Sequence, residues 1–92
     1  MADVIIKLKV MPISPEVDLD NLQKFCEDKI KSFGAKIIHS INQEPVAFGL
    51  KALIFTFLND EKHGDMEALE TAIKQSEDVA SAEVIDVRRA FG

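Results

Sequence analysis

The sequence predicts a small α+β domain whose elements follow in the order strand–helix–strand–strand–helix–strand. Three observations carry this prediction: a strand-like alternation at the start of the chain, two segments whose apolar residues recur at helical spacing, and a long apolar stretch between those segments. The chain has 92 residues, of which 47 % are hydrophobic and 29 % are charged. This is enough apolar side chain for one core, so we expect residues 1–92 to form a single domain.

Residues 4–10 predict the first strand. Apolar side chains stand at every second position with two lysines between them, which is the pattern of a half-buried strand. Pro12 and Pro15 then exclude both continued strand pairing and a regular helix. We therefore expect residues 11–17 to form a connection.

The first helix is expected to follow Asp18, whose carboxylate can accept hydrogen bonds from the free backbone N–H groups of a first turn. Gly34 stands where a residue in the left-handed conformation commonly ends a helix. Between these two residues, apolar side chains recur at helical spacing: Leu19, Leu22, Phe25, Cys26, Ile30 and Phe33.

Two strands are predicted next. The isoleucines at 37, 38 and 41 indicate a strand that leads to Pro45, whose missing N–H favours a bend or an edge position. Residues 50–58 are apolar at odd and even positions alike, apart from a lysine and a threonine. Such a stretch favours a central strand that is buried on both faces.

The remainder of the chain predicts a turn, a helix and a strand. Residues 59–64 are polar and predict the turn, and Asp65 is a second candidate N-cap. Residues 79–87 mix apolar and polar side chains, as expected of a last strand at a sheet edge. The helix between them is indicated by an apolar stripe: Met66, Leu69, Ala72 and Ile73.

Two strand–helix–strand units of this length favour the ferredoxin-like sandwich. In this βαββαβ fold both helices cover one face of a four-stranded antiparallel sheet and leave the other face open. The strand at 50–58 would turn one of two apolar sets toward the open face: either Leu53, Phe55 and Phe57 or Ala52, Ile54 and Leu58. Such groups favour a partner on this face, either another protein or a second copy of the chain, or else cover by lysine stems and the chain's own tail.

Charge and hydropathy argue against two classes of partner, nucleic acids and membranes. The chain has 16 acidic and 11 basic residues, a formal charge of −5, which repels phosphate backbones. Phe55 and Phe57 could stack on RNA bases, but the basic, glycine-containing signature that surrounds such aromatics is absent. No apolar run approaches the ~18 residues that span a membrane, and no basic segment precedes an apolar one. We expect no direct nucleic-acid partner, no membrane association and a cytoplasmic location.

Residue types that commonly perform chemistry are sparse. His39 and His63 are the only histidines, and they lack the spacing of a zinc site. Cys26 falls on the apolar side of the first helix, where we expect a small core residue rather than a nucleophile. Glycine-rich phosphate loops and calcium loops are missing as well. We expect no enzymatic activity, no cofactor and no bound metal.

Two segments are unusual for a purely structural domain. The turn at 44–51 places Phe48 beside a glycine between two strands, where the ring either folds back onto the core or is an exposed anchor for a partner. The end of the chain holds Arg88 and Arg89 in an otherwise acidic protein. These arginines either bind an anion or belong to a solvated tail in which Asp86 pairs with one of them.

Together with the start of the chain, these segments resemble the guanine-nucleotide-exchange domain family of translation elongation factor 1-beta, in its stand-alone archaeal form. The resemblance implies the ferredoxin-like fold and the acceleration of GDP release from elongation factor 1-alpha, the GTPase that delivers aminoacyl-tRNA. It further implies tighter binding to the nucleotide-free GTPase than to the nucleotide-bound form. It rests on three motifs: Asp3-Val4 to Lys9-Val10-Met11-Pro12, Glu44-Pro45-Val46-Ala47-Phe48-Gly49-Leu50-Lys51-Ala52-Leu53, and Ile85-Asp86-Val87-Arg88-Arg89.

The resemblance also implies which residues bind the GTPase. Phe48 matches the phenylalanine with which the family docks on its partner, and Gly49 and Lys51 match the flanking positions.

The family pattern is not matched at the end of the chain. Eukaryotic members use a lysine near their C-terminus that reaches toward the Mg²⁺ site of the GTPase, whereas here that position falls at or near Gly92 and no lysine follows Lys74. By hypothesis, either Arg88 or Arg89 supplies the cation, or exchange depends on displacing loops of the GTPase.

Two other functional classes share this fold. An acylphosphatase-like enzyme would need an anion-binding arginine in the first connection, and residues 11–17 contain no basic residue. A ligand- or RNA-binding regulatory module without exchange activity would bind its ligand in the absence of any GTPase. The exchange factor is the function that the sequence favours over both.

Overall fold

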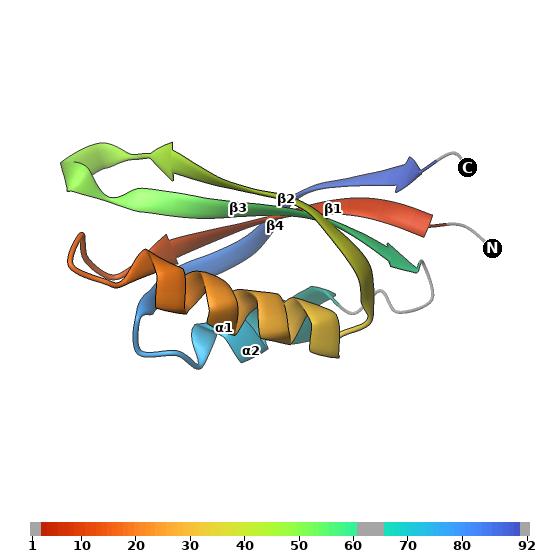
Figure 1. Ribbon diagram of the computed structural model, residues 1–92, viewed down its shortest axis with the longest axis horizontal. Helices are drawn as coiled ribbons and strands as arrows, with labels where there is room; N and C mark the ends of the chain where they lie inside the picture. Colours follow the sequence, from red (N-terminus) through yellow and green to blue (C-terminus); the bar gives the residue numbers. More distant parts are fainter. Residues whose placement is uncertain (1–2, 61–65, 91–92) are drawn as a thin grey trace.

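The computed structural model describes residues 3–60 and 66–90 and confirms the predicted order of elements. The four strands form one antiparallel sheet in the order β2-β3-β1-β4, and both helices lie against the same face of it (Figure 1). This is the ferredoxin-like α+β sandwich. Its elements are β1 (Asp3–Pro12), α1 (Leu19–Ser32), β2 (Ala35–Pro45), β3 (Lys51–Asp60), α2 (Met66–Lys74) and β4 (Val79–Ala90), with a short 3₁₀ turn at Ala47–Gly49.

Three strands run further than the sequence predicts. β1 continues through Met11 and Pro12, which were expected in the connection, because they find partners in Ser81 and Val79 of β4, so the connection begins at Ile13. β3 continues through Asn59 and Asp60, which were expected in a turn, because both find partners in β1 and Asn59 also pairs with Ala35 of β2. β4 continues to Ala90 instead of ending at Val87, because β1 offers pairing partners as far as its first residue. The rest of the expected turn and the candidate cap Asp65 lie outside the described residues.

Strand register settles which side of β3 faces the helices. Phe57, Phe55 and Leu53 stand opposite Ile6, Leu8 and Val10 of β1, and residues directly opposite share a face. All six are buried in one core. The helices close this core with their own buried residues: Leu22, Cys26 and Ile30 from α1, and Leu69 and Ile73 from α2.

The helix-free face receives the other set, Ala52, Ile54 and Leu58, and it is more polar than predicted. Ile54 is only 8 % exposed because it is flanked by Lys9 of β1 and Asn42 of β2, which supports the expected cover by lysine stems. At one end of the face, Leu58 remains beside Ile37 of β2, which is 60 % exposed. Self-association through this face stays a prediction, which light scattering tests.

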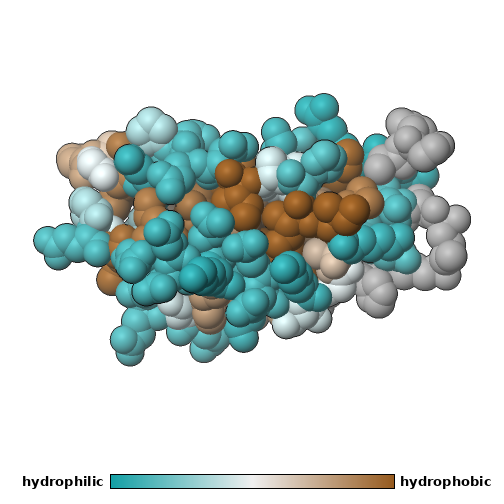
Figure 2. Space-filling model, viewed as in Figure 1, coloured by the Kyte–Doolittle hydropathy of each residue, from teal (hydrophilic) through white to brown (hydrophobic). Residues whose placement is uncertain are grey.

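A band of apolar surface runs along the side of the molecule between the sheet and α1 (Figure 2). β2 is an edge strand there, as Pro45 predicted, so no neighbouring strand covers the core on this side. The core is bordered instead by partly buried residues of β2, of α1 and of the cap that ends this helix: Ile38, Ile41, Leu19 and Phe33. Among the described residues, no helix is long and apolar enough to cross a membrane.

The caps of α1 form as the sequence predicts. The Asp18 Oδ1 atom accepts hydrogen bonds from the backbone N–H groups of Asp20 at 3.0 Å and Asn21 at 3.3 Å. At the other end Gly34 has a φ of +97°, a conformation that glycine adopts without a Cβ clash.

We expect Asp18→Ala to lower the free energy of unfolding by about 1 kcal/mol, because two N–H groups of the first turn lose their acceptor. Asp18→Asn keeps an acceptor oxygen and should stay within about 0.3 kcal/mol of the parent protein. Urea unfolding followed by circular dichroism measures both. Equal losses for the two variants would show that the carboxylate charge, not the cap, stabilises the helix.

Candidate functional site

The turn between β2 and β3 holds the most exposed large hydrophobic residue among those that the structure describes. The Phe48 ring is 93 % exposed, so it does not fold back onto the core. The turn closes on two backbone hydrogen bonds, from the N–H of Val46 to the Leu50 carbonyl at 2.8 Å and from the N–H of Leu50 to the Ala47 carbonyl at 3.3 Å. The backbone thus presents Phe48 at the tip of a two-stranded hairpin.

The backbone at Phe48 is in the left-handed region, with φ 63° and ψ 29°, and Gly49 follows with φ +76°. Glycine adopts this conformation freely, but an L-residue with a bulky side chain costs about 1–2 kcal/mol there. An aromatic ring in water is a further cost to the isolated domain. Strain and exposure at the same residue indicate a function rather than a contribution to the fold.

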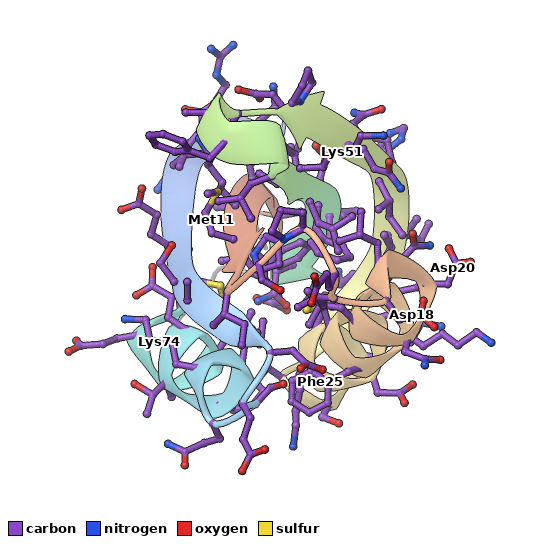
Figure 3. All side chains as sticks on the ribbon, turned by 90° about the vertical axis from the view of Figure 1, so that its left-hand side faces the viewer. Met11, Asp18, Asp20, Phe25, Lys51 and Lys74 are labelled. Atoms are coloured by element: carbon purple, nitrogen blue, oxygen red, sulfur yellow. The ribbon has the colours of Figure 1, made fainter. Side chains whose placement is uncertain are left out.

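Gly49 and Lys51 lie with Phe48 at this end of the molecule. Lys51 is the first residue of β3, pairs with Pro45 and is exposed. Figure 3 looks onto this end, where the hairpin lies above the connection that leads from Met11 to Asp18. A hollow of about 160 Å³ separates the two, and Gly49 and Lys51 line it from the hairpin side.

The two arginines lie in β4 and not in a tail. Arg88 stands opposite Ile5 and Arg89 opposite Val4, so Arg88 is on the helix-free face and Arg89 is on the helix side. The Arg88 Nε atom lies 2.9 Å from the Asp86 Oδ2 atom, and the Arg88 side chain is 77 % exposed. A pair this exposed contributes little stability, and it leaves further guanidinium N–H donors for an anion.

The structure therefore brings three of the five predicted site residues together and places the other two elsewhere. Arg88 is level with Leu58, which lies about seven residues, or ~23 Å, along β3 from Lys51. In Figure 1 the hairpin and the end of β4 lie at opposite ends of a molecule 42 Å long. A partner that contacts both groups must follow the long axis of the domain.

In the described part of the chain, the side chains that commonly bind metals do not cluster at one site. No group of three or more His, Cys, Asp and Glu side chains there could hold a metal ion. Phe55 and Phe57 are buried under the helices, so they cannot stack on RNA bases as the RNA-binding alternative would require. His39 is exposed on the edge strand β2, and His63 lies outside the described residues.

Cys26 is buried in the core, as expected. Burial, with a smaller contribution from the charge of Glu27, raises the pKa of its thiol from 9.0 to about 12. Because the thiolate is the reactive form, this thiol is not a nucleophile near neutral pH.

We expect Cys26 to resist an aromatic disulfide reagent at pH 8 in the native protein and to react fully in urea. A raised thiol pKa also means that Cys26 stays protonated to a higher pH in the folded state than in the unfolded chain. The associated stabilisation is complete below pH 9 and is lost as the pH rises from 9 toward 12. Urea unfolding of the parent and Cys26→Ala across this pH range measures it. Rapid native labelling at pH 8 would contradict the burial.

The hollow under the hairpin is the part of the site that sequence reasoning misses. The two prolines of the first connection indicate only that regular structure stops there. Nothing in the sequence shows that this connection returns beneath a turn more than thirty residues away. The opposite orientations of Arg88 and Arg89 carry a clearer signal, since the alternation of a strand predicts them once the strand is known to continue to Ala90.

Comparison with known proteins gives a consistent family. Residues 5–90 match the family model described as the EF-1 guanine nucleotide exchange domain. Elongation factor 1-beta of Methanothermobacter thermautotrophicus is 43 % identical over 89 residues, which cover 97 % of this chain and 98 % of the relative. Elongation factor 1-beta of Methanococcus vannielii is 38 % identical over 87 residues, 95 % of this chain and 97 % of the relative.

Among solved structures, the chain is similar to the C-terminal domain LarC2 of a cyclometallase involved in the synthesis of the NPN cofactor of lactate racemase. The TM-score is 0.62 at 13 % identity, and the match covers 99 % of this chain and 58 % of that chain. At this identity the similarity shows the fold alone.

Proposed function

Because the chain belongs to the EF-1 guanine nucleotide exchange domain family, we propose that residues 1–92 form one exchange domain that docks its hairpin end on elongation factor 1-alpha. Its role is guanine-nucleotide exchange in translation elongation. The proposal adds which residues make the contact: Phe48, Gly49 and Lys51 at the hairpin, and one of Arg88 and Arg89 at the far end. We place this activity in the cytoplasm.

The observation that carries the proposal is the conformation of Phe48. A strained and almost fully exposed phenylalanine costs the free domain stability, and the cost is offset when a partner buries the ring. Gly49 lets the backbone turn sharply behind the ring, and Lys51 places a cation beside it. An apolar pocket with an acidic rim is the partner surface that these groups fit.

Nucleotide exchange then follows from thermodynamic linkage between two binding events, and this chain forms or breaks no covalent bond in it. If the domain binds the nucleotide-free GTPase more tightly than the GDP-bound form, its binding must weaken GDP binding by the same factor. A cation from β4 supports this when it competes with the partner's Mg²⁺ for the ligands around the phosphates. The separation of the two ends fits such a two-point contact.

We expect the two arginines to differ in exchange, because they point to opposite faces of the sheet. GDP release is measured separately with Arg88→Ala and with Arg89→Ala. The variant that lacks the arginine facing the GTPase should accelerate GDP release about tenfold less or weaker still. The other serves as the matched control and should change the rate about twofold at most. If both single variants and the double variant keep the parent rate, neither arginine supplies the cation.

The experiment that tests the proposed function is release of a fluorescent GDP from elongation factor 1-alpha. A catalytic amount of the protein should accelerate release, and an equal amount of bovine albumin should not. No acceleration of an active cognate GTPase would overturn the proposal. Saturable binding of RNA or a small molecule without any GTPase would then favour the regulatory module.

A further inference from the structure

We propose that the hollow beneath the hairpin is a receptor for one apolar side chain of the same GTPase, so that docking is reciprocal: Phe48 enters the partner, and the partner enters the hollow. Here "connection" denotes residues 13–18, between β1 and α1. This inference rests on the proposed function and adds the connection to the contact surface. No residue of the connection is among those assigned to partner binding above.

The hollow is built by rigid elements. On one side the connection is held by three hydrogen bonds: Ile13 N–H to the Asp78 carbonyl at 2.9 Å, Val17 N–H to the Ser14 carbonyl at 3.3 Å, and Glu16 N–H to Ser14 Oγ at 3.2 Å. Pro15 within the connection and Pro12 directly before it restrict the backbone further. A pocket that exists before the partner arrives binds without an ordering cost.

The size and lining of the hollow define its occupant. Its volume of about 160 Å³ is well below the roughly 300 Å³ at which pockets for drug-sized ligands begin, so a nucleotide does not fit. A cavity of about 150 Å³ accommodates one benzene-sized group. The walls combine apolar side chains, from Pro12, Pro15, Val17 and Leu19, with two polar ones, Ser14 on the connection and Lys51 at the hairpin side. One apolar side chain with a carboxylate nearby on the same partner is complementary to this lining.

We expect a partner surface that binds Phe48 also to contact the hollow. Gly49 lines the hollow and is the residue directly after Phe48 in the turn. A Cβ atom added to Gly49 would lie 3.8 Å from Pro15 Cγ, so the turn lies about one methyl group away from contact with the connection. A surface that encloses the Phe48 ring on one side of this turn therefore lies against the mouth of the hollow.

Filling the hollow tests the inference. Ser14→Leu places an apolar side chain into it and should weaken binding to nucleotide-free elongation factor 1-alpha by about tenfold or more. Ser14→Ala removes the hydroxyl without filling the space and should change the affinity by about threefold at most. Ser76→Leu is the matched control, because Ser76 Oγ accepts from the Asp78 N–H at the same 3.2 Å and Ser76 does not line the hollow.

A second measurement does not depend on the variants folding. In a complex of the methyl-labelled protein with the GTPase, cross-saturation from the partner should reach the Val17 and Leu19 methyl groups that line the hollow. The methyl groups of Ile73, a residue of α2 that is buried in the core, serve as the negative control. Saturation of the Ala47 methyl group, next to Phe48 in the turn, without that of Val17 and Leu19 would overturn the inference.

The outcomes separate the inference from the proposed function. Parent affinity for Ser14→Leu, together with normal GDP release, would refute the receptor and leave the exchange function standing. Failure of the parent protein to accelerate GDP release would refute both. Weakened binding for Ser14→Leu alone, with parent-like behaviour of Ser14→Ala and Ser76→Leu, supports the receptor.

Discussion

Phe48→Ala is expected to reduce the acceleration of GDP release by about 30-fold or more while the domain stays folded, because a buried aromatic anchor typically contributes at least about 2 kcal/mol to a small interface. The ring is 93 % exposed in the free domain, so its removal deletes almost no internal packing. We therefore expect the free energy of unfolding to stay within about 0.5 kcal/mol of the parent value.

Phe48→Gly sharpens this prediction. Glycine relieves the left-handed strain at this position, so the variant should be at least as stable as Phe48→Ala, although the more flexible unfolded chain offsets part of the gain. Exchange should be lost equally in both variants. A stability that rises or holds while exchange falls is the signature of a residue maintained for its partner.

Phe25→Ala is the matched control for Phe48→Ala. Phe25 lies on α1, packs against the edge of the core and has the Lys29 ammonium 5.5 Å from its ring centre. Its loss should lower stability and leave the exchange rate of the folded protein unchanged. Fluorescent GDP release and urea unfolding measured on all three variants decide the matter. Normal exchange by Phe48→Ala would remove the hairpin from the docking surface.

The fold was predictable because periodicity records which residues share a face. The alternation in residues 4–10 and the helical stripe after Asp18 each have one apolar side, so their orientation follows from the pattern alone. β3 was ambiguous because both of its sides are apolar. Only pairing with β1, which sets Phe55 opposite Leu8, selects the side that faces the helices.

The site was predictable in part, for a different reason. Turn composition places Phe48 between two strands, but whether its ring returns to the core depends on backbone angles that the sequence does not specify. The arginines were expected in a tail because local pattern ends the strand at Val87. β4 in fact ends at Ala90, because its residues pair with β1 as far as Asp3. This pairing joins residues from the two ends of the sequence, so the local pattern does not reveal it.

Phe55→Ala is expected to have the largest effect on stability, a loss of about 3–5 kcal/mol. Phe55 is 0 % exposed at the centre of the sheet, with Leu8 of β1 and Ile41 of β2 on either side. Truncation removes the transfer free energy of the ring and leaves a cavity that two hydrogen-bonded neighbours prevent from closing. Urea unfolding of Phe55→Ala measures the loss, and a value near that of Phe55→Leu would show that the core collapses onto the vacated space.

Comparison of Phe55→Ala with Phe48→Ala separates folding from docking, because both variants lose the same atoms. The total stability of a domain this size is only about 5–10 kcal/mol, so Phe55→Ala should leave a measurable unfolded fraction at moderate temperature. Its exchange activity should fall only in proportion to that fraction, and it should recover when conditions restore folding. Phe48→Ala should stay inactive under the same conditions, since its defect lies in the surface that meets the GTPase. Recovery of both variants, or of neither, would contradict the assignment of one phenylalanine to the core and the other to the partner.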